Sequence, residues 1–426
     1  MMTTTAPLFQ LDMDRLTSDL WKNREEYIMF RISKRVAELT EGLKAKGRAP
    51  LSLSIGAPTI PPHQLIVDAL MQAMNQPNVH TYSTTRGELL YREACAARLK
   101  ERFGVEVCPK TEVVSLVGSK EGLAAIFRGL VTPQVAMEER DIVMVPDPGY
   151  ASYVEAIEGA GGRAYGIPIT PANAYLPDMH TVWNEMLASG VDASKVKAFV
   201  INYPSNPIGA TAPLSYLEHC VNFAREKGIL LISDNAYCDM YFAPEAKPHS
   251  VLEVPNAKDV AVEFFSLSKP YSMTGWRIGF VAGNRAATDL VALVKSTIDS
   301  GLYKAIQHAG AFALTSPAIE ANVQEVNKLY AHNQAVFVKA LKTVGWPIDE
   351  ASIPKATFYF WMPIPERYTS CVQFANELLE TSGIVTVPGT AFGKNGEGFV
   401  RLSLVLPEAQ LLEVVERMRT DGFTWQ

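Results

Sequence analysis

The sequence predicts an α/β protein whose larger domain holds a mostly parallel central sheet flanked by helices, next to a smaller α+β domain. Apolar runs of strand length alternate with helical stretches through the middle of the chain, as in parallel sheets with helical crossovers. The C-terminal part instead mixes one long helix with short strands. The chain has 426 residues, more than one hydrophobic core usually organises, so two domains are expected.

The strands of the central sheet are predicted from continuous apolar runs, which are typical of strands buried on both faces. These runs are 113–117, 142–145, 198–201, 229–233, 262–266 and 278–282. Helix formers fill the intervening stretches, and helices are predicted over 68–75, 87–103, 119–130, 150–160, 213–227 and 285–296. This alternation predicts right-handed crossovers between neighbouring parallel strands.

The last third of the chain predicts the smaller domain. It contains a long helical stretch, two strand-like runs and two further helices, over 319–344, 356–362, 400–405, 371–381 and 408–419 respectively. A polar helix-like stretch over 14–47 is expected to pack on this domain. The predicted organisation is an N-terminal segment (1–60), a large domain (61–300) and a small C-terminal domain (301–426).

Composition excludes several classes of function. A formal net charge of −6 gives no basic footprint for nucleic acid. No apolar run approaches the roughly twenty residues that a membrane span needs, and the first residues lack the order of a signal peptide. The five cysteines form no CxxC pair, so they are predicted to be reduced thiols of a cytoplasmic protein. No metal site is predicted.

The most informative residues follow the strand predicted over 262–266. Lys269 lies just beyond the end of this buried strand, where poor hydration disfavours the ammonium form. A neutral lysine amine is a good nucleophile toward an aldehyde. Ser266, Ser268 and Arg277 supply hydroxyls and a guanidinium nearby, which suit a phosphate group. An aldehyde and a phosphate together suggest pyridoxal 5′-phosphate, which carries both.

Further candidates follow other predicted strands, and each has a plainer interpretation. Ser119 and Lys120 open a helix after a strand, where backbone N–H groups attract phosphate, although a serine cap alone explains the turn. Asp234 ends an apolar strand and could keep a pyridine nitrogen protonated, or simply cap a helix. Tyr237 could donate to the phenolic oxygen of the cofactor, or be structural.

The other candidates are weighed in the same way. Asn206 lies in a Pro-bounded turn that could aim its amide inward or form a surface turn. Tyr150 could stack on the pyridine face. Arg401 lies in an apolar run, so it needs a partner, either a substrate carboxylate held by two hydrogen bonds or a structural Asp or Glu.

The order of these candidates along the chain is more informative than any one of them. Phosphate turn, stacking tyrosine, amide turn, acid, lysine and arginine are each expected directly after a buried strand. Loops at the carboxyl ends of parallel strands meet in one crevice. The sequence therefore predicts a single cofactor site at that edge of the sheet.

With these residues in place, the sequence resembles the class I/II aminotransferases, pyridoxal-phosphate enzymes of fold type I. The resemblance runs from about Leu51 to Arg419 and is most specific over Ser-Leu-Ser-Lys-Pro-Tyr-Ser-Met-Thr-Gly-Trp-Arg-Ile-Gly-Phe (266–280). Within this class the chain is similar to the LL-diaminopimelate and alanine (glutamate-pyruvate) groups. Ile298-Asp299-Ser300-Gly301 favours the former, although Thr297 replaces the asparagine usual in that group.

The resemblance implies a role for each candidate toward the cofactor. Lys269, Asp234 and Tyr237 would be the catalytic residues, with Lys269 bonded to the cofactor aldehyde and Asp234 paired with the ring nitrogen. Tyr237 and Asn206 would bind the ring oxygen, and Tyr150 would stack on the ring. The phosphate would be held by Ser266, Ser268, Arg277 and the backbone at Ser119 and Lys120.

It also implies how substrate and a second subunit would take part. Arg401 would bind the substrate α-carboxylate, Gly56 would close over it, Asn206 would contact it, and Tyr27 would lie at the entrance. Tyr82 would reach the phosphate of the neighbouring subunit. The protein would then be a homodimer with shared active sites.

The implied activity is transfer of an amino group between an amino acid and a 2-oxo acid, 2-oxoglutarate or pyruvate, by a ping-pong mechanism with Lys269 as general base. A pyridoxal-phosphate lyase or synthase of the same fold would keep most of these residues. A regulatory protein that senses the cofactor would need a basic recognition helix, which the first fifty residues lack. A binding protein without cofactor is the remaining alternative. The sequence leaves the amino donor, the acceptor and the pathway open.

Overall fold

The computed structural model describes residues 12–22, 26–242 and 247–425. Its main feature is a seven-stranded sheet in the order β2-β8-β7-β6-β5-β3-β4. The strands are β2 Val113–Leu116, β8 Gly279–Gly283, β7 Ala261–Ser266, β6 Leu230–Asp234, β5 Val196–Ile201, β3 Ile142–Asp147 and β4 Arg163–Pro168. Only β8 runs against its neighbours, pairing antiparallel with both β2 and β7. The predicted mostly parallel sheet is confirmed.

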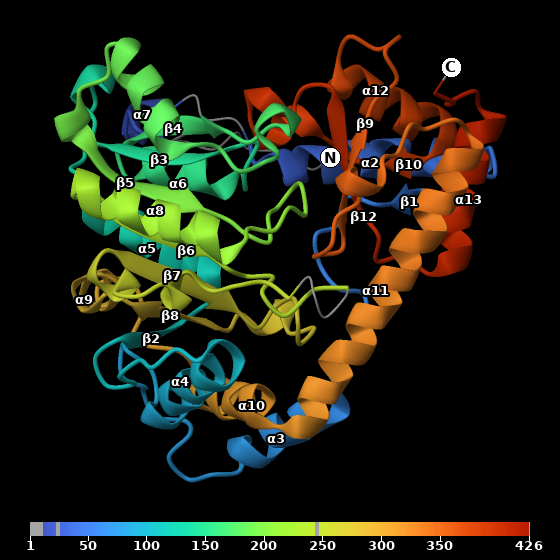
Figure 1. The fold of residues 1–426 in the computed structure, drawn as a ribbon. Coiled ribbons are helices and arrows are strands. Elements are labelled where there is room, and N and C mark those ends of the chain that lie inside the picture. The colour runs from blue at the N-terminus through green and yellow to red at the C-terminus, as the bar shows by residue number, and fades with distance from the viewer. Residues whose placement is uncertain (1–11, 23–25, 243–246, 426) are drawn as a thin grey trace, which may run out of the picture.

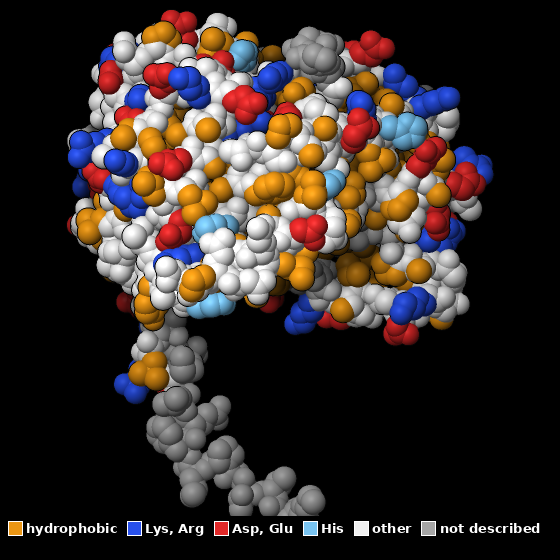
Figure 2. Space-filling model, turned by 90° about the horizontal axis from the view of Figure 1, so that it is seen from below, with side chains coloured by type: hydrophobic (Ala, Val, Ile, Leu, Met, Phe, Trp, Pro, Cys, Tyr) orange, Lys and Arg blue, Asp and Glu red, His pale blue; other side chains and the backbone are white. Residues whose placement is uncertain are grey.

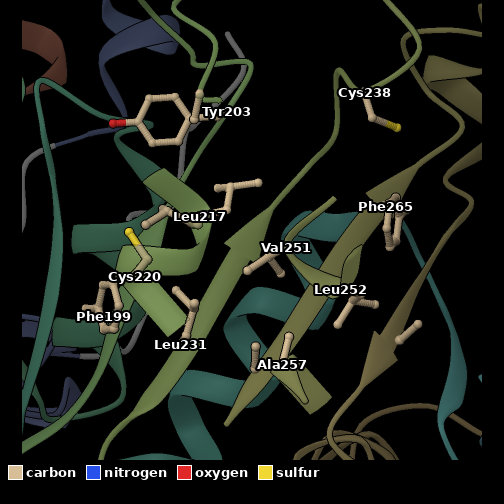
Figure 3. Packing of buried hydrophobic residues seen from close by; sticks show 14 of the residues in the cluster. Phe199, Tyr203, Leu217, Cys220, Leu231, Cys238, Val251, Leu252, Ala257 and Phe265 are labelled. Atoms are coloured by element: carbon tan, nitrogen blue, oxygen red, sulfur yellow. The ribbon is translucent and has the colours of Figure 1, made fainter. Parts of the chain in front are cut away.

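Helices cover both faces of this sheet (Figure 1). On one face, α5 (Ser119–Leu130), α6 (Ser152–Gly159) and α9 (Arg285–Lys295) contribute Phe127, Ile157 and Val291 to one buried cluster. The helices that contribute to the cluster on the other face include α4 Leu89–Phe103, α7 Met179–Ala188, α8 Leu214–Lys227 and α10 Lys304–Thr315. Figure 3 shows this second cluster, with Leu217 and Cys220 of α8 packed over Phe199 and Leu231.

A second body forms around a three-stranded antiparallel sheet in the order β11-β12-β9. Its strands are β9 Tyr359–Pro363, β11 Val387–Pro388 and β12 Phe399–Ser403, and its helices are α12 Cys371–Glu377 and α13 Glu408–Thr420. The short strand β1 (Leu51–Ser52) pairs with β10 (Ile384–Val385), so the chain just before the large sheet contributes a strand beside this body. The preceding elements are α1 (Met13–Leu16) and α2 (Ile28–Ala45).

Helix α11 (Pro317–Thr343) connects the two bodies. Figure 1 shows it running from the side of α3 (Gln64–Met74) and α10 up to α13. Its first turns bury Ile319 in the cluster beside the large sheet, whereas Phe337 and Leu341 are buried in the second body. Along the part of the chain that the structure describes, no helix has the length and apolar character needed to cross a membrane.

The carboxyl ends of β3, β5, β6 and β7 lie at one edge of the large sheet, and this edge positions the candidate residues. One expectation needs correction here: Arg277 does not follow a strand but directly precedes β8. Because β8 is antiparallel, its first residue, Gly279, pairs with Ser266 at the end of β7 and with Leu116 at the end of β2. Arg277 therefore reaches the same edge from the opposite chain direction.

Candidate active site

A cavity of about 220 Å³ lies at this edge, between the large sheet and the second body. All of the predicted site residues except Tyr82 line it. They are Tyr27, Gly56, Ser119, Lys120, Tyr150, Asn206, Asp234, Tyr237, Ser266, Ser268, Lys269, Arg277 and Arg401. Segments more than three hundred residues apart in the sequence thus meet around one space.

Lys269 projects into the cavity from the loop that follows β7. Its Nζ donates to the backbone oxygen of Gly56 at 2.5 Å. Burial, together with the positive charges of Arg401 and Arg277, lowers the pKa of this amine to about 8. The amine is therefore much closer to its neutral, nucleophilic form at physiological pH than an exposed lysine would be.

Asp234 is the last residue of β6 and is buried. Its Oδ2 accepts a hydrogen bond of 2.7 Å from the Tyr153 hydroxyl, on α6. Its Oδ1 is also buried but has no hydrogen-bond partner among the described residues. Burial raises the pKa of this carboxyl to about 6. A buried oxygen without a donor is costly, so this atom is suited to a ligand that brings its own proton.

The other end of the cavity is arranged for an anion. Helix α5 begins at Ser119, and its free N–H groups and dipole face the cavity. The Arg277 guanidinium lies against Gly118, where a β-carbon would collide with it. Arg277 donates to the Thr274 backbone oxygen at 3.0 Å, with the Ser268 hydroxyl at 3.5 Å. Hydroxyls, a guanidinium and a helix start together can bind a phosphate group.

Arg401 is buried on β12 at the side of the cavity nearest the second body. It donates to Asn206 Oδ1 at 3.0 Å and to the Ser54 backbone oxygen at 2.8 Å. The rings of Tyr359 and Phe392 lie 4.4 and 4.8 Å from its guanidinium carbon. Its hydrogen-bond partners among the described residues include no carboxylate, and its Nε has no partner there. The structural Asp or Glu that the sequence left open is thus not found in these parts of the chain.

The site also includes three side chains that the sequence did not identify: Asn202, Tyr359 and Tyr153. Asn202 directly follows β5 and donates to the Asp234 backbone oxygen at 2.7 Å. It could have been predicted, because it is a polar residue directly after a buried strand, like the other candidates. The hydroxyls of Tyr359 and Tyr237 lie 2.9 Å apart. Tyr359 and Tyr153 lie within an apolar strand and a helix, where the sequence gives no sign of a polar role.

The remaining predicted residues take more peripheral positions. Lys120 Nζ lies 4.7 Å from the centre of the Tyr27 ring, so the segment before α2 reaches the mouth of the cavity. At Gly56, a β-carbon would lie 2.5 Å from the Tyr359 hydroxyl, so a side chain there would displace that ring. Tyr82 is 87% exposed and does not line the cavity.

Comparison with known proteins gives a consistent picture. The sequence pattern of one family, described as "Aminotransferase class I and II", matches residues 48–418. An LL-diaminopimelate aminotransferase from Moorella thermoacetica is 38% identical over 393 residues, covering 92% of this chain and 95% of that protein. LL-diaminopimelate aminotransferase 2 from a Nostoc species is 40% identical over 386 residues, covering 90% and 94%.

Solved structures agree with the sequence comparison. Substrate-bound BacF from Bacillus subtilis superimposes with a TM-score of 0.85 at 32% identity, covering 95% of this chain and 97% of that one. A Thermus thermophilus aspartate aminotransferase double mutant gives a TM-score of 0.83 at 25% identity, covering 95% and 99%. The fold class and the resemblance inferred from the sequence are confirmed, and the chain belongs to the class I and II aminotransferase family.

Proposed function

We propose that this aminotransferase uses pyridoxal 5′-phosphate bound through Lys269, and that it acts on LL-diaminopimelate or a similar amino acid. The observation that carries the proposal is the position of the Lys269 amine. It lies in one cavity with a buried carboxyl, an anion-binding end and the buried guanidinium of Arg401. Each of these groups matches one part of the cofactor or of an amino acid bound to it.

The fit to the cofactor rests first on Asp234. Its Oδ1 lacks a donor among the described residues, and a protonated pyridine nitrogen would supply one. Ser266, Ser268, Arg277 and the backbone at Ser119 and Lys120 would hold the phosphate. Tyr237 and Asn206 would bind the ring oxygen, and Tyr150, whose ring packs edge-on against Tyr153 at 5.5 Å, would stack on the ring.

The substrate end follows from Arg401. A carboxylate would form two parallel hydrogen bonds with its guanidinium, exchanging the present contact with Asn206 Oδ1 for a charged partner. The rings of Tyr359 and Phe392 restrict the guanidinium and exclude water around it. Gly56, whose carbonyl now accepts from Lys269, would close over the substrate, with Asn206 and Tyr27 beside it.

The chain's own groups would perform the proton transfers. When bound, the cofactor supplies an electron sink and a carrier for the amino group. Asp234, ionised above its pKa of about 6, would keep a proton on the ring nitrogen. Lys269 Nζ would remove the proton from the substrate α-carbon and deliver it to the former aldehyde carbon. Arg401 would hold the α-carboxylate so that the α-proton faces this amine.

The substrate assignment draws on the relatives named LL-diaminopimelate aminotransferase. The test is a panel of amino donors offered with 2-oxoglutarate or pyruvate, with each new amino acid and any released ammonia measured. The expected result is transfer from LL-diaminopimelate to 2-oxoglutarate at a kcat/KM well above that of alanine, aspartate or aromatic donors. A preference for alanine would indicate an alanine (glutamate-pyruvate) aminotransferase, whereas release of ammonia without transfer would indicate a lyase.

We further propose that the active protein is a homodimer. Tyr82 would then reach the partner's phosphate, which agrees with its exposure and its absence from the lining of its own subunit's cavity. Helix α3 exposes Leu65, Met71 and Met74, and Figure 2, which views the molecule from the side of α3 and α10, shows hydrophobic side chains gathered across this face. A second copy of the chain would cover them.

A further inference from the structure

We propose that Glu263, a buried residue behind the sheet edge, is a positioning residue for the Asp234 carboxylate. It binds the side chains on both sides of Asp234 and so fixes where that carboxylate points. This inference rests on the proposed role of Asp234 toward the cofactor ring nitrogen. Glu263 itself does not line the cavity.

Glu263 lies on β7 directly opposite Ser233 of β6. Its Oε1 accepts hydrogen bonds from the Ser233 hydroxyl at 2.8 Å and from the Asn235 amide at 3.0 Å. Because side chains alternate along a strand, Ser233 and Asn235 point to the face of Glu263, whereas Asp234 points to the other face. The Glu263 carboxyl thus accepts hydrogen bonds from both residues that flank Asp234 in the sequence.

The rest of the Glu263 carboxyl is bound to the segment that starts the short helix Val251–Glu253. The Val251 N–H donates to Oε1 at 3.2 Å, and the Ser250 hydroxyl donates to Oε2. Figure 3 shows Val251 and Leu252 packed over this face of the sheet, so the carboxyl is enclosed by apolar groups. Only 1% of Glu263 is exposed, and burial raises its pKa to about 7.

A carboxyl group buried without a cation is an expensive way to fill a core. An apolar side chain would pack there without needing donors. The donors that Glu263 does have are concentrated on the residues flanking Asp234 and on one helix start. Such an arrangement stabilises one particular conformation of the strand end rather than the core in general.

The opposite face of the strand completes the positioning. Tyr153 binds Asp234 Oδ2, Asn202 binds the Asp234 backbone oxygen, and the Asn235 N–H donates to the Phe264 backbone oxygen at 2.9 Å. The backbone of Asp234 is thus held from both sides and its Oδ2 is fixed by Tyr153. Only Oδ1 remains available to a ligand. Loss of Glu263 would free Ser233 and Asn235 and let this oxygen move away from the ring nitrogen.

The experiment measures the pH titration of the visible absorption band of the cofactor-loaded enzyme, together with kcat and KM. A proton on the ring nitrogen disfavours a second proton on the nearby lysine–cofactor linkage. If Asp234 is misplaced, the ring proton is lost more easily, and the midpoint of the titration rises. Glu263→Leu is therefore expected to raise this midpoint by about one unit and to lower kcat roughly tenfold or more with KM little changed.

Two variants separate positioning from general stability. Glu263→Gln keeps an oxygen for Ser233, Asn235 and Val251 and can donate to Ser250, so it should restore the midpoint and kcat. Gln334→Ala removes another buried polar side chain, which donates to the Pro354 backbone oxygen at 2.8 Å. It should lower the melting temperature without moving the midpoint. If Glu263→Leu does not fold, Ser233→Ala removes the hydrogen bond between Ser233 and Glu263 instead. This variant should shift the midpoint in the same direction, but by less.

Asp234→Asn is the reference that separates the two hypotheses. If it raises the midpoint while Glu263→Leu and Ser233→Ala leave it unchanged, the positioning role of Glu263 is wrong and the proposed function stands. If Asp234→Asn itself leaves the midpoint unchanged, the role of Asp234 is wrong, and the inference about Glu263 is overturned with it.

Discussion

At the scale of single residues, burial acts in opposite directions on the two groups central to the site. It raises the pKa of the Asp234 carboxyl to about 6 and lowers that of the Lys269 amine to about 8. Both shifts arise because burial disfavours the charged form. The acid still stays ionised at pH 7, whereas the amine gains a usable neutral fraction, as a nucleophile and base requires.

A pH dependence follows for the cofactor-free protein. Only the neutral Lys269 amine attacks an aldehyde, so the rate of pyridoxal phosphate uptake should rise with pH and level off above a pKa of about 8. With an ordinary lysine, whose pKa is about 10.4, the uptake rate would continue to rise with pH up to that value. Stopped-flow absorbance between pH 6.5 and 9.5 measures this rate. A rate that still rises tenfold per unit at pH 9 would show that the amine is not shifted.

Arg401 gives a second prediction at this scale. Arg401→Lys keeps a charge but loses the planar fork that binds a carboxylate with two hydrogen bonds. Removing one partner of a buried charge pair costs about 2–5 kcal/mol. Arg401→Ala should therefore lower kcat/KM for the amino donor roughly a hundredfold or more, and Arg401→Lys by less. Steady-state kinetics with cofactor saturating provides the measurement, and a value within threefold of wild type in both variants would contradict the assignment.

Individual residues differ in how far the sequence could identify them. Lys269, Asp234 and Asn206 lie at or just beyond the ends of strands made mostly of apolar residues, so a polar side chain there stands out. Tyr359 and Tyr153 are aromatic residues within apolar segments, and their hydroxyl contacts depend on packing between elements distant in sequence. Glu263 is visible as a charge inside a strand, but its partners come from two segments that are distant from it in the sequence.

At the scale of elements, the start of α5 forms the anion-binding end. Gly118 precedes this helix with φ +77°, and a β-carbon there would collide with the Arg277 guanidinium. Gly118→Ala should cost about 1–2 kcal/mol of stability from the backbone strain and, by displacing Arg277, weaken cofactor binding roughly tenfold. Absorbance titration with pyridoxal phosphate gives the affinity, and thermal unfolding gives the stability.

Gly104, which ends α4 with φ +69°, is the matched control. A β-carbon there meets nothing within 4 Å, so Gly104→Ala should carry a similar strain and leave cofactor affinity unchanged. If Gly118→Ala and Gly104→Ala bind the cofactor equally well, the start of α5 does not bind the phosphate, and this part of the proposed site is wrong.

The elements show where sequence patterns are informative and where they are not. The sequence predicts the buried strands β2, β3, β5, β6, β7 and β8 and the helices α5, α6, α8 and α9 to within a few residues, because continuous apolar runs and helix formers reflect burial directly. Strand β4 (Arg163–Pro168) was missed because it is an edge strand and only half-buried. Helices α7 and α10 were also missed. The direction of β8 could not be predicted, because a strand buried on both faces carries the same apolar pattern whether it runs parallel or antiparallel to its neighbours.

At the scale of the whole molecule, the site lies between two bodies that α11 connects. The predicted division placed the small domain from residue 301. Helix α10 nevertheless shares a buried cluster with α4 and β8, and Phe337 shares one with β9 and β12. We propose that the boundary lies within α11. The side chains that close the cavity from the second body, Tyr359, Phe392 and Arg401, would then move together relative to Lys269.

The proposed dimer gives a prediction about complementation between subunits. Tyr82→Ala should weaken cofactor binding roughly tenfold or more through loss of a charge-assisted hydrogen bond. A hybrid of one Tyr82→Ala subunit and one Lys269→Ala subunit would contain one site with both native residues, if Tyr82 acts across the interface. Differently tagged subunits, co-expressed and purified as the hybrid, should therefore recover wild-type cofactor affinity at half the sites. Affinity as weak as in the Tyr82→Ala homodimer would place Tyr82 in its own subunit's site.

The account depends most on a covalent bond between Lys269 and the aldehyde of pyridoxal phosphate. Borohydride reduction of the cofactor-loaded protein, followed by peptide mass spectrometry, tests this bond directly. The expected result is one stoichiometric phosphopyridoxyl group on the peptide containing Lys269, and none on that peptide when Lys269 is replaced by alanine. A modification spread over surface lysines, or concentrated on another lysine, would contradict the account.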